Sequence, residues 1–255
     1  MIRKIINGHI LKIYDSIDEL PIQNFQKYNK LLLIDSGIGS DIDSIDAHML
    51  TLGKYIRSNE LNKAIQELQN MRQNMFMVVE NISPRYMAFA ALIAEIDGRK
   101  VTDLSEDNLK SILELLKQVP HRWLVDLFET LKKKLKDELE LYFPKMHGSD
   151  PLEKEAYDRL KQRVLLVLES IQKDKNKDAE IEALETQMFS LSKPKVFYGT
   201  SNVEIQYDKQ FLSTCLLLSQ RLHIKAEELT VLQFYNAVDT VKAQIDAENK
   251  AYKSK

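Results

Sequence analysis

Two long segments between residues 120 and 171 carry apolar side chains at alternating intervals of three and four residues, which places them on one face of a helix. The stripes are Leu124, Leu127 or Phe128, Leu131, Leu135, Leu139 and Tyr142 in the first segment, and Tyr157, Leu160, Val164, Val167 or Leu168, and Ile171 in the second. Each helix would be about 20 residues and roughly 30 Å long. Because Pro144 and Pro151 bracket a short loop, the pattern predicts a long antiparallel helical hairpin over residues 120–171.

Similar spacing recurs through most of the chain. Only 7 Gly and 6 Pro occur in 255 residues, so turns are few and the elements between them are long. We predict helices at residues 21–35, 42–56, 59–80, 83–96, 106–119, 209–222 and 226–247. The methionines of the 59–80 helix, including Met75, are expected to fill gaps in the core. The predicted fold class is mainly α, a multi-helix bundle.

Two small β-hairpins are predicted beside the helices, at residues 2–14 and 195–207. In the first, Asn7-Gly8 is the dipeptide preferred for a two-residue turn, since both central residues must take positive φ. In the second, two apolar runs flank Gly199-Thr-Ser-Asn202. An isolated hairpin is marginally stable in water, so each is expected to dock on another element.

The order of these elements divides the chain into three parts. An N-terminal hairpin and helical domain spans residues 1–119, the long helical hairpin spans residues 120–171, and the remainder spans residues 172–255. This last part holds a charged connector, the second β-hairpin and the C-terminal helices. A chain of this length suits one large domain or two small ones, so the three parts could also form a single domain.

The tripeptide Gly37-Ile-Gly39 follows an apolar run and precedes a helix, as in a nucleotide-binding loop. The further glycine and the lysine of such a loop are missing, and Asp41, Asp43 and Asp46 would repel a phosphate. We interpret the stretch as a corner between two helices, with Ser40 and Asp43 as a capping box. The three aspartates lack the glycine and distal glutamate of a calcium loop, so no metal site is predicted.

No catalytic, cofactor-binding or metal-binding residues are predicted. Nucleophilic catalysis needs a Ser, Cys or Thr beside an activating base, and the five histidines stand in no such motif: His9, His48, His121, His147 and His223. Cys215 lies in an apolar run and is expected to be a buried, inert thiol in a reducing compartment. The chain is therefore predicted to be non-enzymatic.

Charge and hydropathy argue against two further classes of protein. The formal charge is −2, and the lysines between Lys132 and Lys136 are flanked by acidic residues, which is typical of a solvated helix face rather than a nucleic-acid site. No run approaches the roughly 20 apolar residues of a membrane span, and the N-terminus lacks the apolar core of a signal peptide. No membrane partner is expected.

Four runs within roughly the first 110 residues resemble a protein family encoded by tailed phages of gut Bacteroidales: Ile13–Pro21, Lys27–Asp41, Ala64–Arg72 and Met87–Gly98. The second run, KYNKLLLIDSGIGSD, contains the helix corner described above. The resemblance implies a structural virion protein of crAss-like, Bacteroidales-infecting short-tailed phages. Within that setting it is similar to a ring or adaptor subunit of the portal–tail connector. It transfers no catalytic residues.

The resemblance also implies partners and a location. The chain would associate with itself in a ring of about twelve copies, contact the portal and other tail or ring proteins, and surround passing genomic DNA without sequence-specific binding. It would reside in the virion, and in the host cytoplasm during assembly. The two β-hairpins, at residues 1–14 and 195–207, are hypothesised to extend sheets of neighbouring proteins. A helix with a narrow apolar stripe, Ile181, Leu184, Met188 and Leu191, is expected to lie across a partner surface.

Two alternatives remain open at this stage. The first is a tail-assembly chaperone or a packaged cargo protein, which would also be helical. The second is a soluble enzyme of unknown activity, for which a deep pocket with perturbed carboxylates or histidines would be the indication.

Overall fold

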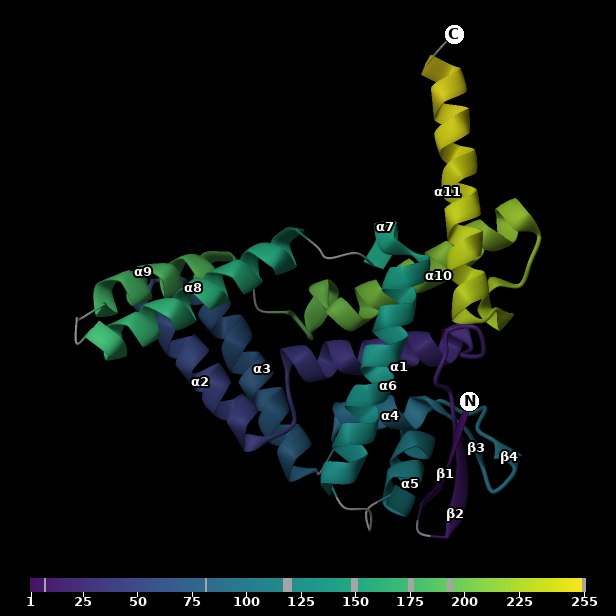
Figure 1. Ribbon diagram of the computed structural model, residues 1–255, viewed down its shortest axis with the longest axis horizontal. Coiled ribbons are helices and arrows are strands. Elements are labelled where there is room, and N and C mark those ends of the chain that lie inside the picture. The colour runs from purple at the N-terminus through teal and green to yellow at the C-terminus, as the bar shows by residue number, and fades with distance from the viewer. Residues whose placement is uncertain are drawn as a thin grey trace.

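The computed structural model describes residues 1–6, 8–80, 82–116, 121–147, 151–173, 177–191 and 195–253. Over these residues the fold is mainly α, a multi-helix bundle with a small antiparallel sheet, as the sequence predicts (Figure 1). The sheet lies at one end of a helical body, two helical hairpins extend from the opposite side, and the C-terminal helix projects away from the body.

The sheet contains four strands in the order β1-β2-β3-β4. The predicted first hairpin is confirmed as β1 (Ile2–Ile6) and β2 (His9–Ile13), which pair antiparallel with Ile2 opposite Ile13. Gly8 takes the positive φ of +82° that the turn requires, while Asn7 lies outside the described residues. Leu11 and Ile13 of β2 are buried, so this hairpin docks on the body.

The second hairpin is formed by β3 (Ile93–Ile96) and β4 (Arg99–Lys100), where the sequence predicts the end of a helix. Helix α4 (Pro84–Ala91) ends earlier than predicted. Asp97 and Gly98 both take positive φ, +50° and +81°, and so make a two-residue hairpin turn that reverses the chain. Asp97 also accepts a hydrogen bond from the amide of Ile10 at 2.8 Å, which holds the turn against β2.

The core lies between the sheet and helices α1 (Ile22–Gly37), α4, α5 (Glu106–Leu116) and α6 (His121–Tyr142). The predicted stripe of α6 is largely buried here, and the ring of Phe128 packs edge-on against Tyr28 and Phe89 with centroids about 6 Å away. The predicted start of this helix at Pro120 lies outside the described residues. Tyr142, at the end of the predicted stripe, is exposed.

The prediction of a β-hairpin at residues 195–207 is wrong. Residues 195–198 are irregular, a 3-10 turn η1 (Gly199–Ser201) follows, and helix α10 (Val203–Leu222) begins within the predicted second strand. Asn202 explains the difference, because its side-chain oxygen accepts from the amide of Glu204 at 2.8 Å and its side-chain nitrogen donates to the carbonyl of Phe197 at 2.9 Å. The residue thereby caps the helix.

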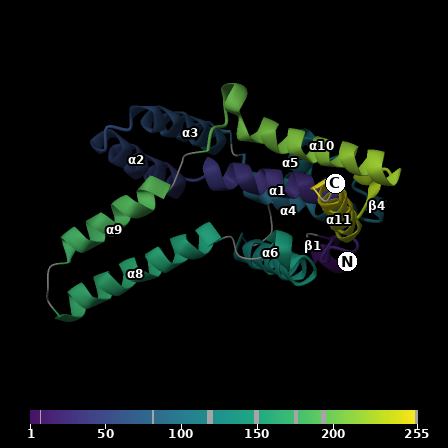
Figure 2. The same cartoon turned by 90° about the horizontal axis from the view of Figure 1, so that it is seen from above.

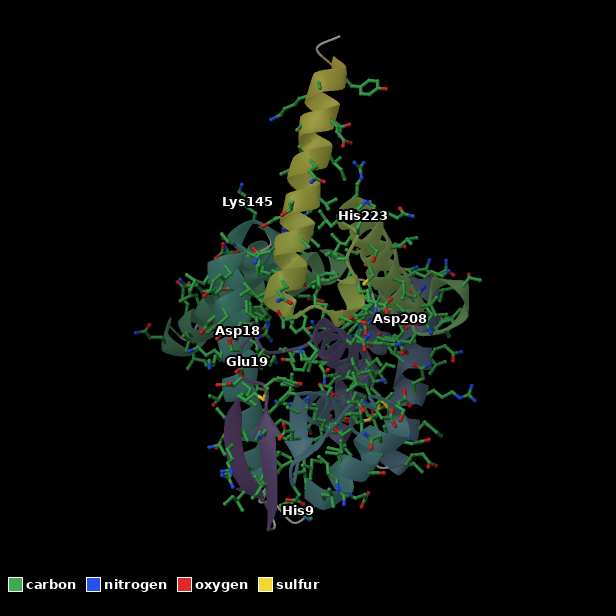
Figure 3. All side chains as sticks on the ribbon, turned by 90° about the vertical axis from the view of Figure 1, so that its right-hand side faces the viewer. His9, Asp18, Glu19, Lys145, Asp208 and His223 are labelled. Atoms are coloured by element: carbon green, nitrogen blue, oxygen red, sulfur yellow. The ribbon has the colours of Figure 1, made fainter. Side chains whose placement is uncertain are left out.

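The C-terminal segment closes over the start of α1. After the 3-10 turn η2 (Ala226–Glu228), Thr230 forms a β-bridge with Pro21, and helix α11 (Val231–Lys253) begins. Lys30 of α1 and Asp208 of α10 form an ion pair at 2.7 Å, which ties these two helices together. Figure 3 shows Asp208 on the body below α11, whose far end extends away from the sheet end where His9 lies.

The long helical hairpin predicted over residues 120–171 is also wrong in its pairing. A one-turn helix, α7 (Pro144–His147), follows α6, and α8 (Pro151–Lys173) then leaves the body and packs against α9 (Asp178–Leu191) (Figures 1 and 2). The apolar stripe of α6 is buried against the body, so this stripe is not available to pack against α8. The partner of α8 is the next helix rather than the preceding one.

The predicted helix corner is confirmed between α1 and α2 (Ile42–Arg57). Helix α3 (Leu61–Val79) then runs back along α2 as a second helical hairpin. The cap of α2 is Asp41 rather than the predicted Ser40, since the Asp41 carboxylate accepts from the amide of Ser44 at 2.7 Å. Hydrogen bonds from the side chain and the amide of Ser44 lower the pKa of Asp41 below its ordinary value.

Candidate functional site

The α2–α3 hairpin has polar side chains on its inner side. His48 of α2 contacts Glu67 of α3 through Nδ1 at 2.7 Å and the carbonyl of Ile38 through Nε2 at 2.7 Å. A carboxylate and a carbonyl both accept, so the protonated form of the imidazole donates one hydrogen bond from each ring nitrogen. The hydrogen bond to Glu67 raises the pKa of His48 above its ordinary value, although burial acts in the opposite direction.

Two buried asparagines continue this polar interior along α3. Asn74 donates from its side chain to the carbonyl of Ile38 at 2.7 Å, and Asn70 donates to the carbonyl of Lys195 at 2.9 Å. Both asparagines are almost fully buried. The hairpin is therefore fixed to the end of α1 and to the segment before α10 by directed hydrogen bonds.

The glycines of the corner serve close packing in this arrangement. A Cβ atom added at Gly37 would lie 2.5 Å from the ring of Phe197, and Gly39 has φ of +72° and lies directly against Ser44 and Asn74. Only a residue without a side chain fits both positions. The interpretation of Gly37-Ile-Gly39 as a helix corner is supported, because these contacts explain why both positions are glycine.

The outer side of the hairpin is apolar and exposed. We define the α2–α3 apolar surface as the large apolar residues of the two helices that are between 47% and 79% exposed: Ile42, Met49, Leu50 and Ile56 of α2, and Leu61, Ile65, Leu68, Met75, Phe76 and Val79 of α3. The prediction that the methionines of this helix fill the core is wrong for Met75. In this hairpin the polar stripe is buried, and the apolar stripe faces outward.

Contacts within the hairpin bring the two exposed stripes to the same level. The pair His48–Glu67 and the position of Lys63 over the ring of Tyr55 set the antiparallel register. In that register Met49 of α2 is level with Leu68 of α3, and Ile56 and Leu61 flank the turn that joins the helices. The apolar residues therefore extend along the whole length of the hairpin.

A second exposed stripe lies on α8. We define the α8 apolar surface as Leu160, Val164, Leu165, Leu168 and Ile171, each of which is about half exposed or more. Its spacing matches the prediction, while the side chain of Tyr157 lies outside the described residues. Leu165 and Leu166 also line a groove with Ala183 and Leu184 of α9. Of the narrow stripe predicted for α9, Leu184 thus lies against α8. The side chains of Met188 and Leu191 are not described.

A cleft of about 800 Å³ with a mixed polar and apolar lining opens beside the helix corner. Its lining includes Asp35 and Asp41 from the two sides of the corner, and Arg85 and Tyr86 from α4. Burial raises the pKa of Asp35 above its ordinary value, whereas hydrogen bonds to Ser44 lower that of Asp41. Arg85 is held by an ion pair with Glu129.

The remaining residues singled out by the sequence form no common site within the described ranges. Cys215 is buried, and burial raises the pKa of its thiol to about 11, which leaves it protonated. His9 pairs with Asp97, His223 ends α10 with φ of +54°, and burial against the region of Tyr235 lowers the pKa of His147. The side chain of His121 is not among those described.

The described residues contain neither a cluster suited to a metal ion nor a helix suited to a membrane. No group of three or more His, Cys, Asp or Glu side chains with metal-binding geometry occurs in the described part of the chain, Asp41, Asp43 and Asp46 included. None of its described helices combines the length and the apolar character needed to cross a bilayer.

The apolar positions of α2 and α3 were predicted from the sequence, but the polar interior of the α2–α3 hairpin was not. Glu67, Asn70 and Asn74 recur at intervals of three and four residues on the side of α3 opposite to its apolar stripe. That second periodicity was the available signal. Comparison with protein-family models, curated proteins and solved structures gave no match to this chain.

Proposed function

We propose that this protein is a non-enzymatic structural subunit of a phage virion, a ring or adaptor component of the portal–tail connector that assembles around the DNA passage. The observation that carries the proposal is the presence of two exposed apolar surfaces on separate helical hairpins, α2–α3 and α8–α9. Large exposed apolar patches are typical of surfaces that a partner covers. The sequence runs that resemble crAss-like phage proteins supply the biological setting.

Two different surfaces on one chain are better suited to a ring than to a two-fold symmetric dimer. In a ring each subunit uses one surface toward one neighbour and another surface toward the next, and a closing rotation completes the assembly. The formal charge of −2 is also compatible with a collar around DNA, because a strongly basic lining would retain the genome by phosphate contacts.

The first test measures mass. The purified protein, alone and mixed with the portal protein of the same phage, is examined by native mass spectrometry. We expect a closed oligomer of about twelve copies in at least one of the two samples. A protein that stays monomeric in both samples would contradict the proposal.

The alternative of a tail-assembly chaperone or packaged cargo is favoured by the same exposed apolar residues, since a chaperone also needs them. Imaging and proteomics of purified particles separate the two functions. Ordered copies at the connector support the ring subunit, whereas a chaperone would be absent from mature particles and a cargo protein would leave with the DNA.

The alternative of a soluble enzyme is favoured by one observation, the cleft that contains Asp35. A carboxyl group whose pKa is raised by burial is suited to general acid–base work. An activity that Asp35→Asn abolishes without loss of folding would favour the enzyme. The hydroxyl group of Ser40 donates to that of Ser83 at 3.5 Å in this cleft, and no histidine occurs among the described residues that line it.

The hypothesis that the N-terminal hairpin extends a neighbouring sheet is kept for residues 1–14. Strand β1 is at the edge of the sheet, and Ile5 is 71% exposed. Deleting residues 1–14 would remove Leu11 and Ile13 from the core, so Ile5→Lys is the sharper test. We expect weaker incorporation into particles with unchanged folding; unchanged incorporation would reject the hypothesis.

A further inference from the structure

We propose that the α8 apolar surface of one copy binds the α2–α3 apolar surface of the next copy, in a head-to-tail contact. This inference rests on the proposed function, because it names the contact that would close the ring. The occupant of each surface is a second copy of this chain, and the contact joins two hairpins that extend from the body at different places (Figure 2).

Both surfaces have the shape that such a contact needs. The α8 stripe from Leu160 to Ile171 spans about 17 Å along its axis, and the α2 stripe from Ile42 to Ile56 spans about 21 Å. A single helix can lie along the two-helix surface, in the same way that an amphipathic helix occupies a groove. The hairpin α8–α9 stands away from the body, so α8 is free to reach a neighbour.

The charges at the starts of the two surfaces are complementary. The first turns of α2 carry exposed Asp43 and Asp46. The start of the α8 stripe is flanked by three basic residues, Arg159, Lys161 and Arg163, and by one acidic residue, Asp158. With α8 parallel to α2, the basic start of α8 meets the acidic start of α2.

A head-to-tail contact also accounts for both surfaces at once. If each surface bound its own copy about a two-fold axis, two separate interfaces would be needed, and a dihedral assembly or an open chain rather than a cyclic ring would follow. One heterologous contact covers the α2–α3 surface and the α8 surface of every subunit. It therefore leaves neither stripe exposed in the closed assembly.

Cysteine crosslinking tests the pairing directly. Two full-length variants are prepared, Leu68→Cys on α3 and Val164→Cys on α8. Each variant is oxidised alone, and the two are also oxidised as a mixture. All samples are kept under the conditions in which native mass spectrometry detects the assembly. Buried Cys215 serves as the internal background. We expect a disulfide-linked dimer in the mixture only, because each variant provides one side of the contact.

Other crosslinking results overturn the inference. Dimers in the Leu68→Cys sample alone would indicate a symmetric contact between α2–α3 surfaces, and dimers in the Val164→Cys sample alone would indicate one between α8 surfaces. A chain that carries both substitutions could also form a disulfide within itself at concentrations where the protein is monomeric. This result would show that α8 binds the α2–α3 hairpin of the same chain. Oligomers with no crosslink in any sample would place the interface elsewhere.

A charge exchange gives an independent readout. We expect Asp46→Lys to weaken self-association at least about tenfold, and Lys161→Glu to restore part of that loss when it is present in the same chain. The matched control is Leu141→Gln, which removes a 77% exposed leucine of α6 outside both surfaces and should leave association unchanged. A loss without rescue by Lys161→Glu would contradict the assigned partner.

These experiments keep the two proposals distinguishable. An oligomer that is insensitive to Leu68→Gln and Val164→Gln refutes the contact while the ring function stands. A chain that is monomeric alone and with the portal protein refutes the function, and the contact with it.

Discussion

The body of the protein and its α2–α3 hairpin distribute polar and apolar residues in opposite ways. In the described part of the body, the buried side chains are almost all apolar, as at Phe89, Phe128 and Ile93. In the hairpin, His48, Glu67 and Asn74 lie inside, and Leu68 and Met75 lie outside. The contrast teaches that apolar burial shapes the body, whereas directed hydrogen bonds position the hairpin and leave its apolar surface available to a partner.

The largest effect is expected in the body. Phe128→Ala removes a ring that contacts Tyr28 and Phe89, and we expect a loss of about 3–5 kcal/mol in the free energy of unfolding. Urea denaturation followed by circular dichroism measures it. The control on the same helix is Leu141→Ala, at an exposed position, which should change the free energy by no more than about 0.5 kcal/mol. Equal effects at both positions would remove the basis of the comparison.

The next effect is expected where the two regions meet. Gly37→Val would place side-chain atoms against the ring of Phe197, and we expect a loss of about 1–3 kcal/mol in the free energy of unfolding. Gly53→Ala is the control within α2, since a Cβ atom there meets nothing within 4 Å; it should stabilise by up to about 1 kcal/mol. A tolerated valine would mean that Phe197 does not hold the end of α1.

A pH dependence of the stability is expected from His48 in the hairpin. The pKa of His48 is raised in the folded chain, so its stabilisation is complete below the unfolded pKa of about 6.5 and is lost as the pH rises through the folded pKa. We expect His48→Gln to cost about 1–2 kcal/mol at pH 6 and less at pH 9. The difference between wild type and variant in urea midpoints measures this. A difference that grows with pH would contradict the protonated His48.

The smallest effect is expected on the outer surface. Leu68→Gln should change the free energy of unfolding of the monomer by no more than about 0.5 kcal/mol, because the side chain is already 47% exposed. Denaturation below the concentration at which the chain associates measures it. A loss of several kcal/mol would show that the surface belongs to the core of the chain itself, and the contrast between the two regions would then disappear.

Local signals in the sequence predicted most of the elements. Helical spacing located α2, α3, α6 and α8, and the dipeptide Asn7-Gly8 located the first hairpin. Short apolar runs predicted the type of element less well. The run Ile93–Ile96 is compatible with a helix or a strand. It forms a strand because Asp97 and Gly98 both take positive φ and make a hairpin turn after it. At Val203–Tyr207 the alternation suggested a strand, but the cap formed by Asn202 starts a helix.

The candidate site could be predicted only in part, because periodicity identifies a stripe but not what covers it. The apolar positions of α2 and α3 were found, while their exposure depends on the bonds of His48 and Asn74 to Ile38, ten or more residues away. Helix pairing depends on the same competition. The stripe of α6 is buried against the body, and α8 packs against α9.

The outward stripe of the α2–α3 hairpin has a consequence for how the sequence can diverge. Random substitution would replace exposed apolar residues with polar ones at little cost to folding, so the fold exerts no selection to keep Ile65, Leu68 or Phe76. In diverged copies of this chain, retained apolar character at these positions would therefore record selection by a binding partner. Variation at Phe89 or Phe128, by contrast, would be limited by the core of the protein itself.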